Sequence, residues 1–193
     1  MKPVRLKLIL TFFVALFGSA AAHGQGIIWN KDKPLQWNNF RGKENNNAIL
    51  DAWVCAGEYY SSKWEMENGK YVLKFETTSV MYPDSSWAKE GAHTDRMLRH
   101  VQRRFDISEF FARQMRTALN AYKYTDDYNN EAMQVATILA QERNAMLLTY
   151  EDQTKHSDDY KYQKKWDAYI ADLLNSNYTL EEALAKEPKK VVY

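Results

Sequence analysis

The back half of the chain carries a hydrophobic pattern with the period of an α-helix. From Thr94 onward, apolar residues recur at steps of three and four, which places them on one face of a helix. A threonine directly before such a run is a common N-cap, so Thr94 predicts where the helix begins. This long stripe consists of Met97, Val101, Phe105, Ser108, Ala112, Met115, Leu119 and Tyr122.

The same period predicts further helices over about residues 129–148 and over residues 160–174. In the helix over residues 129–148, the apolar stripe includes one charged residue, Arg143. The other members of the stripe are Ala132, Val135, Leu139 and Met146. Thr179 and Glu182 have the spacing of a capping box, in which each side chain bonds the backbone N–H of the other. A short last helix is therefore predicted to begin there.

The front half of the chain has the composition of β-strands. Residues 35–40 and 48–60 are rich in Trp, Tyr, Val and Ile. Residues 63–67 and 70–75 flank Asn-Gly, a dipeptide that favours a two-residue hairpin turn. Tyr71, Leu73 and Phe75 alternate with Lys74 and Glu76, as in a half-buried strand. Antiparallel strands followed by three to four helices, the first of them long, predict an α+β fold.

The first 22 residues have the three parts of a secretory signal peptide. Lys2, Arg5 and Lys7 precede an unbroken apolar run over residues 8–17, and five small residues follow it. A bilayer span needs ~20 apolar residues, so this run is too short for a membrane anchor. Cleavage is predicted after residue 22, or alternatively before Gln25. We therefore expect a secreted or periplasmic protein with a single domain over residues 23–193.

Charge and composition exclude several classes of function. The net charge is +1, and removing the three cations of the leader leaves −2. Such a chain has no electrostatic preference for nucleic acid or for an anionic membrane surface. Glycine is sparse and forms no phosphate-binding loop. Because Cys55 is the only cysteine, an internal disulfide is impossible and the core alone must stabilise the domain.

One segment carries candidate chemistry, residues 98–109 with the sequence LRHVQRRFDISE. It resembles a helix found in the bacterial domain-of-unknown-function family number nine hundred and twenty-two, described as secreted zinc-dependent proteases. That helix reads H-E-Q-x-H-F-D-I, then x-E, and continues to an Ala-Arg pair. The positions shared here are His100, Gln102, Phe105, Asp106, Ile107, Glu109, Ala112 and Arg113.

Three further segments support the resemblance and occur in the same order as in the family. Leu35-x-Trp37-x-x-Phe40-x-Gly42 is similar to the opening L-x-W-x-D-F-x-G, and Ser86-Trp87 precedes the long helix. Tyr150-x-x-x-Thr154-x-His156 is similar to Y-D-x-x-T-x-H-G, with Glu151 and Ser157 at the places of aspartate and glycine, and Gln163 and Trp166 follow.

The resemblance implies a metalloprotease-like long helix and zinc, but the residues that zinc chemistry needs have been replaced. In an H-E-x-x-H helix the two histidines bind zinc and the glutamate is the general base. Here the base position is Val101 and the second ligand position is Arg104, whose guanidinium has no lone pair to donate. His100 and His156 remain, whereas catalytic zinc takes three protein ligands. We expect no zinc cofactor and a vestigial site of His100, Val101, Arg104 and His156.

The vestigial site makes a geometric prediction. His100 and Arg104 are about 40° apart around a helix, so their side chains project together. We expect His156 to join them, and a carboxylate such as Glu151 or Asp152 to neutralise Arg104. We also expect His100→Ala to cost little stability, because water would replace its partners at a cleft. The alternative is a solvated face of the helix or a structural pair, the common settings for such residues.

The function predicted from these residues is that of an exported, catalytically inactive protease-like protein that binds a protein or peptide. Two alternatives stay open. The first is an active metal-dependent peptidase or hydrolase with non-standard ligands. The second is a structural protein of the cell envelope, because a fold alone does not decide function.

Overall fold

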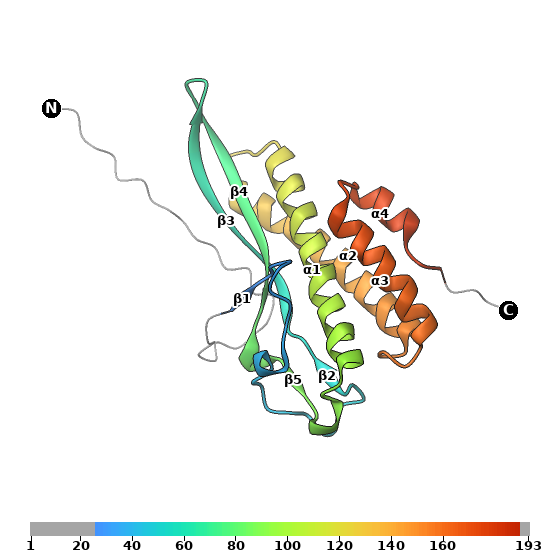
Figure 1. Cartoon of the computed structure of the whole chain (residues 1–193). Coiled ribbons are helices and arrows are strands. Elements are labelled where there is room, and N and C mark those ends of the chain that lie inside the picture. Colours follow the sequence, from blue (N-terminus) through green and yellow to red (C-terminus); the bar gives the residue numbers. More distant parts are fainter. Residues whose placement is uncertain (1–25, 190–193) are drawn as a thin grey trace.

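The computed structural model describes residues 26–189 and has the predicted α+β fold. Strands occupy the first part of this range and four α-helices follow them (Figure 1). The expected signal peptide lies outside the described residues. Within residues 26–189, no helix combines the length and the apolar character needed to cross a membrane.

A long antiparallel hairpin forms the main sheet. Strand β3 (Ala56–Glu67) pairs along its whole length with β4 (Lys70–Met81), and β1 (Ile27–Ile28) pairs with the other edge of β4. The turn is the predicted Asn68-Gly69, and both residues have positive φ, 49° and 77°. The strands are far longer than the predicted segments. A second, small sheet consists of β2 (Ala52–Trp53) and β5 (Trp87–Ala88).

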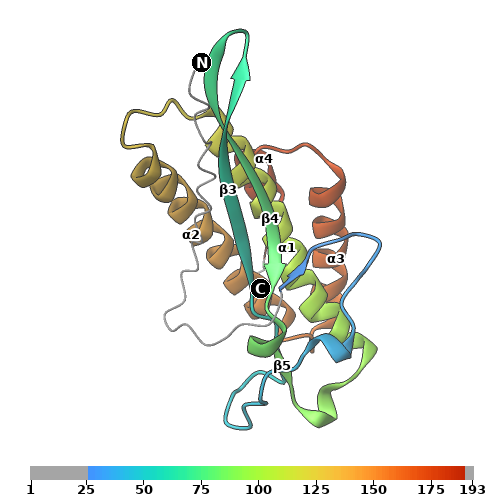
Figure 2. The same ribbon diagram turned by 90° about the vertical axis from the view of Figure 1, so that its left-hand side faces the viewer.

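The helices pack around α1 (Asp95–Ala121). Figure 2 looks onto the hairpin and shows α1 behind it, with α2 (Tyr128–Thr154) on one side and α3 (Tyr160–Asn175) on the other. The short helix α4 (Leu180–Lys186) follows α3. Thr94 caps α1 through the N–H of Met97, and Thr179 and Glu182 form the predicted capping box.

Helix α1 is buried on several faces because it lies between the sheets and the other helices. Val101 and Phe105 pack in one cluster with Leu35, Val54 and Met81. A second cluster joins α1 to α2, α3 and α4 through Ile107, Phe110, Phe111, Met146, Tyr150, Trp166, Tyr169, Ile170, Leu173 and Ala183. A helix with apolar contacts on opposite sides fixes the positions of any polar side chains between them.

Parts of the strand prediction were wrong. Residues 35–40 contain no strand but a single 3-10 turn, η1 (Trp37–Asn39), and the strand composition of residues 48–60 resolves into β2 and the beginning of β3. The segment at Leu35 bonds to α1 instead of to a strand, because its backbone N–H donates to the side chain of Gln102 at 2.7 Å. Its apolar residues therefore enter the core from a loop.

Two other boundaries also differ from the prediction. Tyr71 is 61% exposed, because the turn end of the hairpin extends beyond the helices (Figures 1 and 2). Helix α2 continues to Thr154, six residues past the predicted end at Leu148. The extra turns are not visible as an apolar stripe because three of their buried residues, Glu151, Gln153 and Thr154, are polar.

Candidate functional site

His100 and Arg104 lie on a buried face of α1. Their exposed fractions are 3% and 6%, so the alternative of a solvated helix face is wrong. Arg104 lies against the ring of Trp53, with its guanidinium carbon 4.3 Å from the ring centroid. A buried guanidinium keeps its charge and therefore requires a nearby anion.

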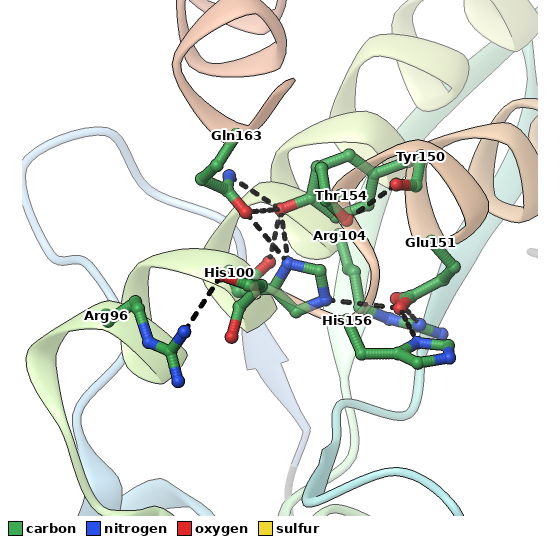
Figure 3. A network of polar contacts seen from close by, with 9 residues as sticks. Arg96, His100, Arg104, Tyr150, Glu151, Thr154, His156 and Gln163 are labelled. Atoms are coloured by element: carbon green, nitrogen blue, oxygen red, sulfur yellow. Dashed lines mark hydrogen bonds and ion pairs between the residues drawn. The ribbon is translucent and has the colours of Figure 1, made fainter. Parts of the chain in front are cut away.

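That anion is Glu151, in the last turn of α2. Its carboxylate contacts three cationic or potentially cationic side chains (Figure 3). Oε1 accepts a hydrogen bond from Arg104, and Oε2 lies 3.2 Å from Nε2 of His100 and 2.6 Å from Nδ1 of His156. The structure thus brings together His100, Arg104 and His156, as predicted, with Glu151 at their centre.

The turn after α2 carries His156 back over this carboxylate. Lys155, His156 and Ser157 all have positive φ, 47°, 53° and 84° respectively. The N–H of His156 bonds to the carbonyl of Glu151 at 3.3 Å, and Arg96 of α1 donates to the carbonyl of Ser157 at 3.2 Å. Three successive left-handed residues without glycine are strained, and such strain is kept where surrounding contacts hold it.

The other nitrogen of His100 faces Gln163 of α3. The distance from His100 Nδ1 to Gln163 Oε1 is 3.0 Å, and Tyr150 Oη is 2.9 Å from the same nitrogen. The orientation of the Gln163 amide is fixed, because its Nε2 donates to Asp167 Oδ1 at 3.1 Å and a flipped amide would face that carboxylate with oxygen. Oxygen therefore faces Nδ1.

Both ring nitrogens of His100 have hydrogen-bond partners. Nε2–H donates to the Glu151 carboxylate, which only accepts, and Nδ1 contacts Gln163 Oε1 and Tyr150 Oη. Tyr150 then donates to the carbonyl oxygen of His100 at 3.1 Å and accepts from Gln163 Nε2 at 2.9 Å. Every polar group around the ring is satisfied within the protein. The expectation that water could replace these partners is therefore wrong.

The surroundings of Glu151 stabilise its ionised form. Burial by itself raises the pKa of this carboxyl, but the hydrogen bond from His100, the charge of Arg104 and the hydrogen bond from His156 outweigh burial and lower the pKa to about 2. A carboxylate held this way is a weak proton acceptor at neutral pH, since a general base works best with a pKa near the working pH.

Val101 lies apart from these residues. Its side chain is fully buried in the apolar cluster beside the sheets, with Ala52, Met97 and Phe105. Of the four predicted site residues, three converge on Glu151 and Val101 belongs to the core. The position is packed, so an ionised side chain there would be buried without a partner.

A second buried ion pair lies close by and was not predicted as a site. Arg143 of α2 donates to Glu58 of β3 at 2.9 Å, and both side chains are buried. Arg143 fits against the strand because Gly57 has no side chain; an added Cβ would lie 3.1 Å from its guanidinium. The signal in the sequence was a charged residue at an apolar position of the α2 stripe.

The donor set around Glu151 does not fit the zinc that the family resemblance implies. Tetrahedral zinc holds its ligands at about 2.0–2.1 Å, which separates neighbouring ligand atoms by roughly 3.3 Å. His156 and Glu151 are in direct hydrogen-bond contact at 2.6 Å, and the guanidinium of Arg104 bonds the same carboxylate. Among residues 26–189, no group of three His, Cys, Asp or Glu side chains is arranged to hold a metal ion.

No protein-family model, curated protein or solved structure matches the chain. The family resemblance therefore stays a prediction from the motifs, and the site has to be interpreted from its own geometry.

Proposed function

We propose that this protein is an exported, non-catalytic binding protein in which the Arg104–Glu151 ion pair takes the place of a metal centre. The observation that carries the proposal is the contact of a buried guanidinium with the carboxylate that also binds both histidines. A fixed positive charge at this point repels a divalent cation, and it supplies the charge that holds α1 to the end of α2.

The side chains near the cluster also favour binding over catalysis. Val101 has no proton to transfer and lies in the core. Glu151 is saturated with donors and has a pKa of about 2. The base position of the metalloprotease-like helix and the carboxylate that contacts this helix from α2 are thus both unsuited to acid–base work. A protein or peptide is the ligand class that we propose, bound without hydrolysis.

One observation favours the alternative of a metal-dependent hydrolase with unusual ligands. His100, Glu151 and His156 are two histidines and a glutamate, the donor types of several catalytic zinc sites, and they lie together. For them to bind zinc, the guanidinium of Arg104 would have to leave the carboxylate. The alternative therefore makes a different prediction for a variant that lacks this charge.

A zinc titration distinguishes the two functions. Protein purified from an exporting host is titrated with zinc by calorimetry, alongside Arg104→Gln, which removes the charge but keeps hydrogen-bonding ability. We expect no stoichiometric zinc in the natural protein and a gain of affinity of about tenfold or more in Arg104→Gln, because a like charge has been removed. One tightly bound zinc per chain, lost in His100→Gln, would refute the non-catalytic proposal.

Binding and hydrolysis are then measured on the same ligands. Peptides selected from a random library on the immobilised protein are tested by fluorescence anisotropy for affinity and by mass spectrometry for cleavage. We expect saturable binding and intact peptides after prolonged incubation. Cleavage at a defined bond that is abolished by His100→Gln would show that the protein is an enzyme.

A further inference from the structure

The two outer edges of the long hairpin differ in how their backbone groups are satisfied. On the β4 edge, side chains of α1 take the place of a further strand. Asn120 bonds both the N–H and the carbonyl of Phe75, at 3.0 and 2.8 Å, and Glu109 accepts from the N–H of Ser79 at 3.4 Å. Phe75 is in register with Ser62 of β3, so the backbone groups of Ser62 also point away from the partner strand.

The outer edge of β3 has no such cover over most of its length. Outward-pointing backbone groups recur at every second residue, which places them at Tyr60, Ser62, Trp64 and Met66. Within residues 26–189, no strand or side chain bonds these groups, and only the beginning of β3 is contacted, through Arg143. An open edge of this kind accepts another extended strand.

Apolar side chains accompany this open edge on one face of the hairpin. Trp64 and Met66 are 47% and 62% exposed, and Tyr71, which is in register with Met66, is exposed as well. They share a face with Tyr60, whose side chain is in the core against the helices. The turn end of the hairpin extends beyond the helices (Figure 2), so the helices of the same chain leave these side chains largely uncovered.

A cavity lies where this face meets the beginning of α2. It has a volume of about 120 Å³, and its walls include Tyr60 and Ser62 of β3 and Asn130 and Met133 of α2. None of the described residues that line it is charged. Because the cavity adjoins the open edge, an uncharged side chain of an added strand can enter it.

We propose that a second copy of this chain occupies the open edge, with the two β3 strands antiparallel about a two-fold axis at Trp64. The charges on the other face of β3 select this register. An axis at Lys63 or at Glu65 places like charges directly opposite each other, whereas an axis at Trp64 places Lys63 of each copy opposite Glu65 of the other. An axis at Ser62 pairs neither charge with an opposite one and brings the second hairpin closer to Arg143.

The same register covers the apolar surface. Met66 of one copy lies opposite Ser62 of the other, at the cavity beside α2, and its unbranched side chain adapts to irregular spaces. The two Trp64 side chains meet at the axis. The interface is self-complementary, as two-fold symmetry requires, and it joins the hairpins into one continuous sheet. This inference is independent of the proposed binding function.

Sedimentation velocity over a range of concentrations tests the dimer. We expect a monomer–dimer equilibrium that Lys63→Glu or Glu65→Lys weakens at least about tenfold, because each variant places like charges opposite each other. The double variant Lys63→Glu/Glu65→Lys should restore the affinity to within about threefold, and Lys164→Glu, on the exposed side of α3, is the charge control. A dimer that is insensitive to Lys63→Glu would overturn the proposal. So would a protein that stays monomeric, which would leave the edge to a segment of another protein.

Disulfide cross-linking tests the register. In a Cys55→Ser background, Trp64→Cys places two cysteines opposite each other with Cα atoms about 5.5 Å apart, within reach of a disulfide. Ser62→Cys and Lys63→Cys place theirs roughly 8 Å or more apart, too far for this bond. We expect Trp64→Cys to cross-link at least about ten times faster under mild oxidation, measured by non-reducing electrophoresis. Equal rates, or faster cross-linking at either control position, would overturn the proposed pairing.

Discussion

The protein contains two buried Arg–Glu ion pairs, Arg143–Glu58 and Arg104–Glu151, and the pKa values of their carboxyl groups are shifted in opposite directions. Burial raises the pKa of Glu58, and the charge of Arg143 only partly opposes it. Glu151 is also buried, but hydrogen bonds and charges from His100, Arg104 and His156 lower its pKa to about 2.

The difference between the two pairs lies in the number of donors. Glu58 has one cationic partner, and its Oε1 is buried without a partner among the described residues. Both oxygens of Glu151 are engaged, one of them by two donors. The ionised form of a buried carboxylate is thus stabilised when both oxygens accept hydrogen bonds from several donors, and a single guanidinium does not fully offset its desolvation.

The same substitution at each site gives the largest expected effect. Glu151→Gln leaves one acceptor oxygen for three donors and turns an amide N–H toward a histidine N–H, so we expect a loss of about 3–5 kcal/mol in the free energy of unfolding. Glu58→Gln is the matched control and should cost less, because burial already disfavours the ionised form of Glu58. Urea denaturation at pH 7 measures both, and equal losses would contradict the comparison.

The pH dependence of stability is expected to show the opposite shifts. The folded pKa of Glu151 lies below its ordinary value of 4.5, so its contribution is present above 4.5 and is lost as pH falls toward about 2. The full shift corresponds to about 3 kcal/mol. Glu58 has a raised folded pKa, so its contribution to stability increases as pH falls through that value.

Denaturation profiles between pH 6 and pH 2 test these signs. Glu151→Gln should flatten the loss of stability below pH 4.5, and Glu58→Gln should remove the gain in stability that Glu58 contributes above pH 4.5 as the pH falls. An unchanged profile in Glu151→Gln would show that other carboxyl groups cause the acid instability.

His100→Ala has an intermediate expected effect. It removes the ring that satisfies Glu151 and Gln163, so we expect a loss of about 2–3 kcal/mol, compared with the small loss predicted from the sequence. His93→Ala is a useful control because His93 lies outside the cluster and stacks on Trp37. Chemical denaturation of both variants checks this, and a loss below about 0.5 kcal/mol for His100→Ala would contradict the buried network.

Ser157→Gly has the smallest expected effect and the opposite sign. Ser157 has φ 84°, and its buried Oγ has no partner among the described residues. Glycine removes both penalties. This gain is partly offset because glycine also increases the chain entropy of the unfolded state, so we expect the free energy of unfolding to rise by about 1 kcal/mol. Ser157→Ala, which keeps the Cβ and the strain, separates the two contributions in a thermal melt.

The accuracy of the sequence predictions varied with how local the responsible interactions are. The turn at Asn68-Gly69, the cap at Thr94 and the capping box at Thr179 were all correct, because each depends on residues within one turn of the chain. Residues 35–40 were wrongly predicted as a strand, because their apolar residues pack on α1 from a loop. A composition typical of strands indicates that side chains are buried as much as it indicates that the backbone pairs in a sheet.

Periodicity and motif spacing were sufficient to predict the α+β class, the long helix and the shared direction of His100 and Arg104. Tertiary structure alone decided that Glu151, and not another acid, joins them, that Val101 enters the core, and that Arg143 and Glu58 form a second buried pair. The reason is that helical periodicity orders residues around one axis. The dielectric surroundings and partners of a charge depend on which other elements pack against that axis.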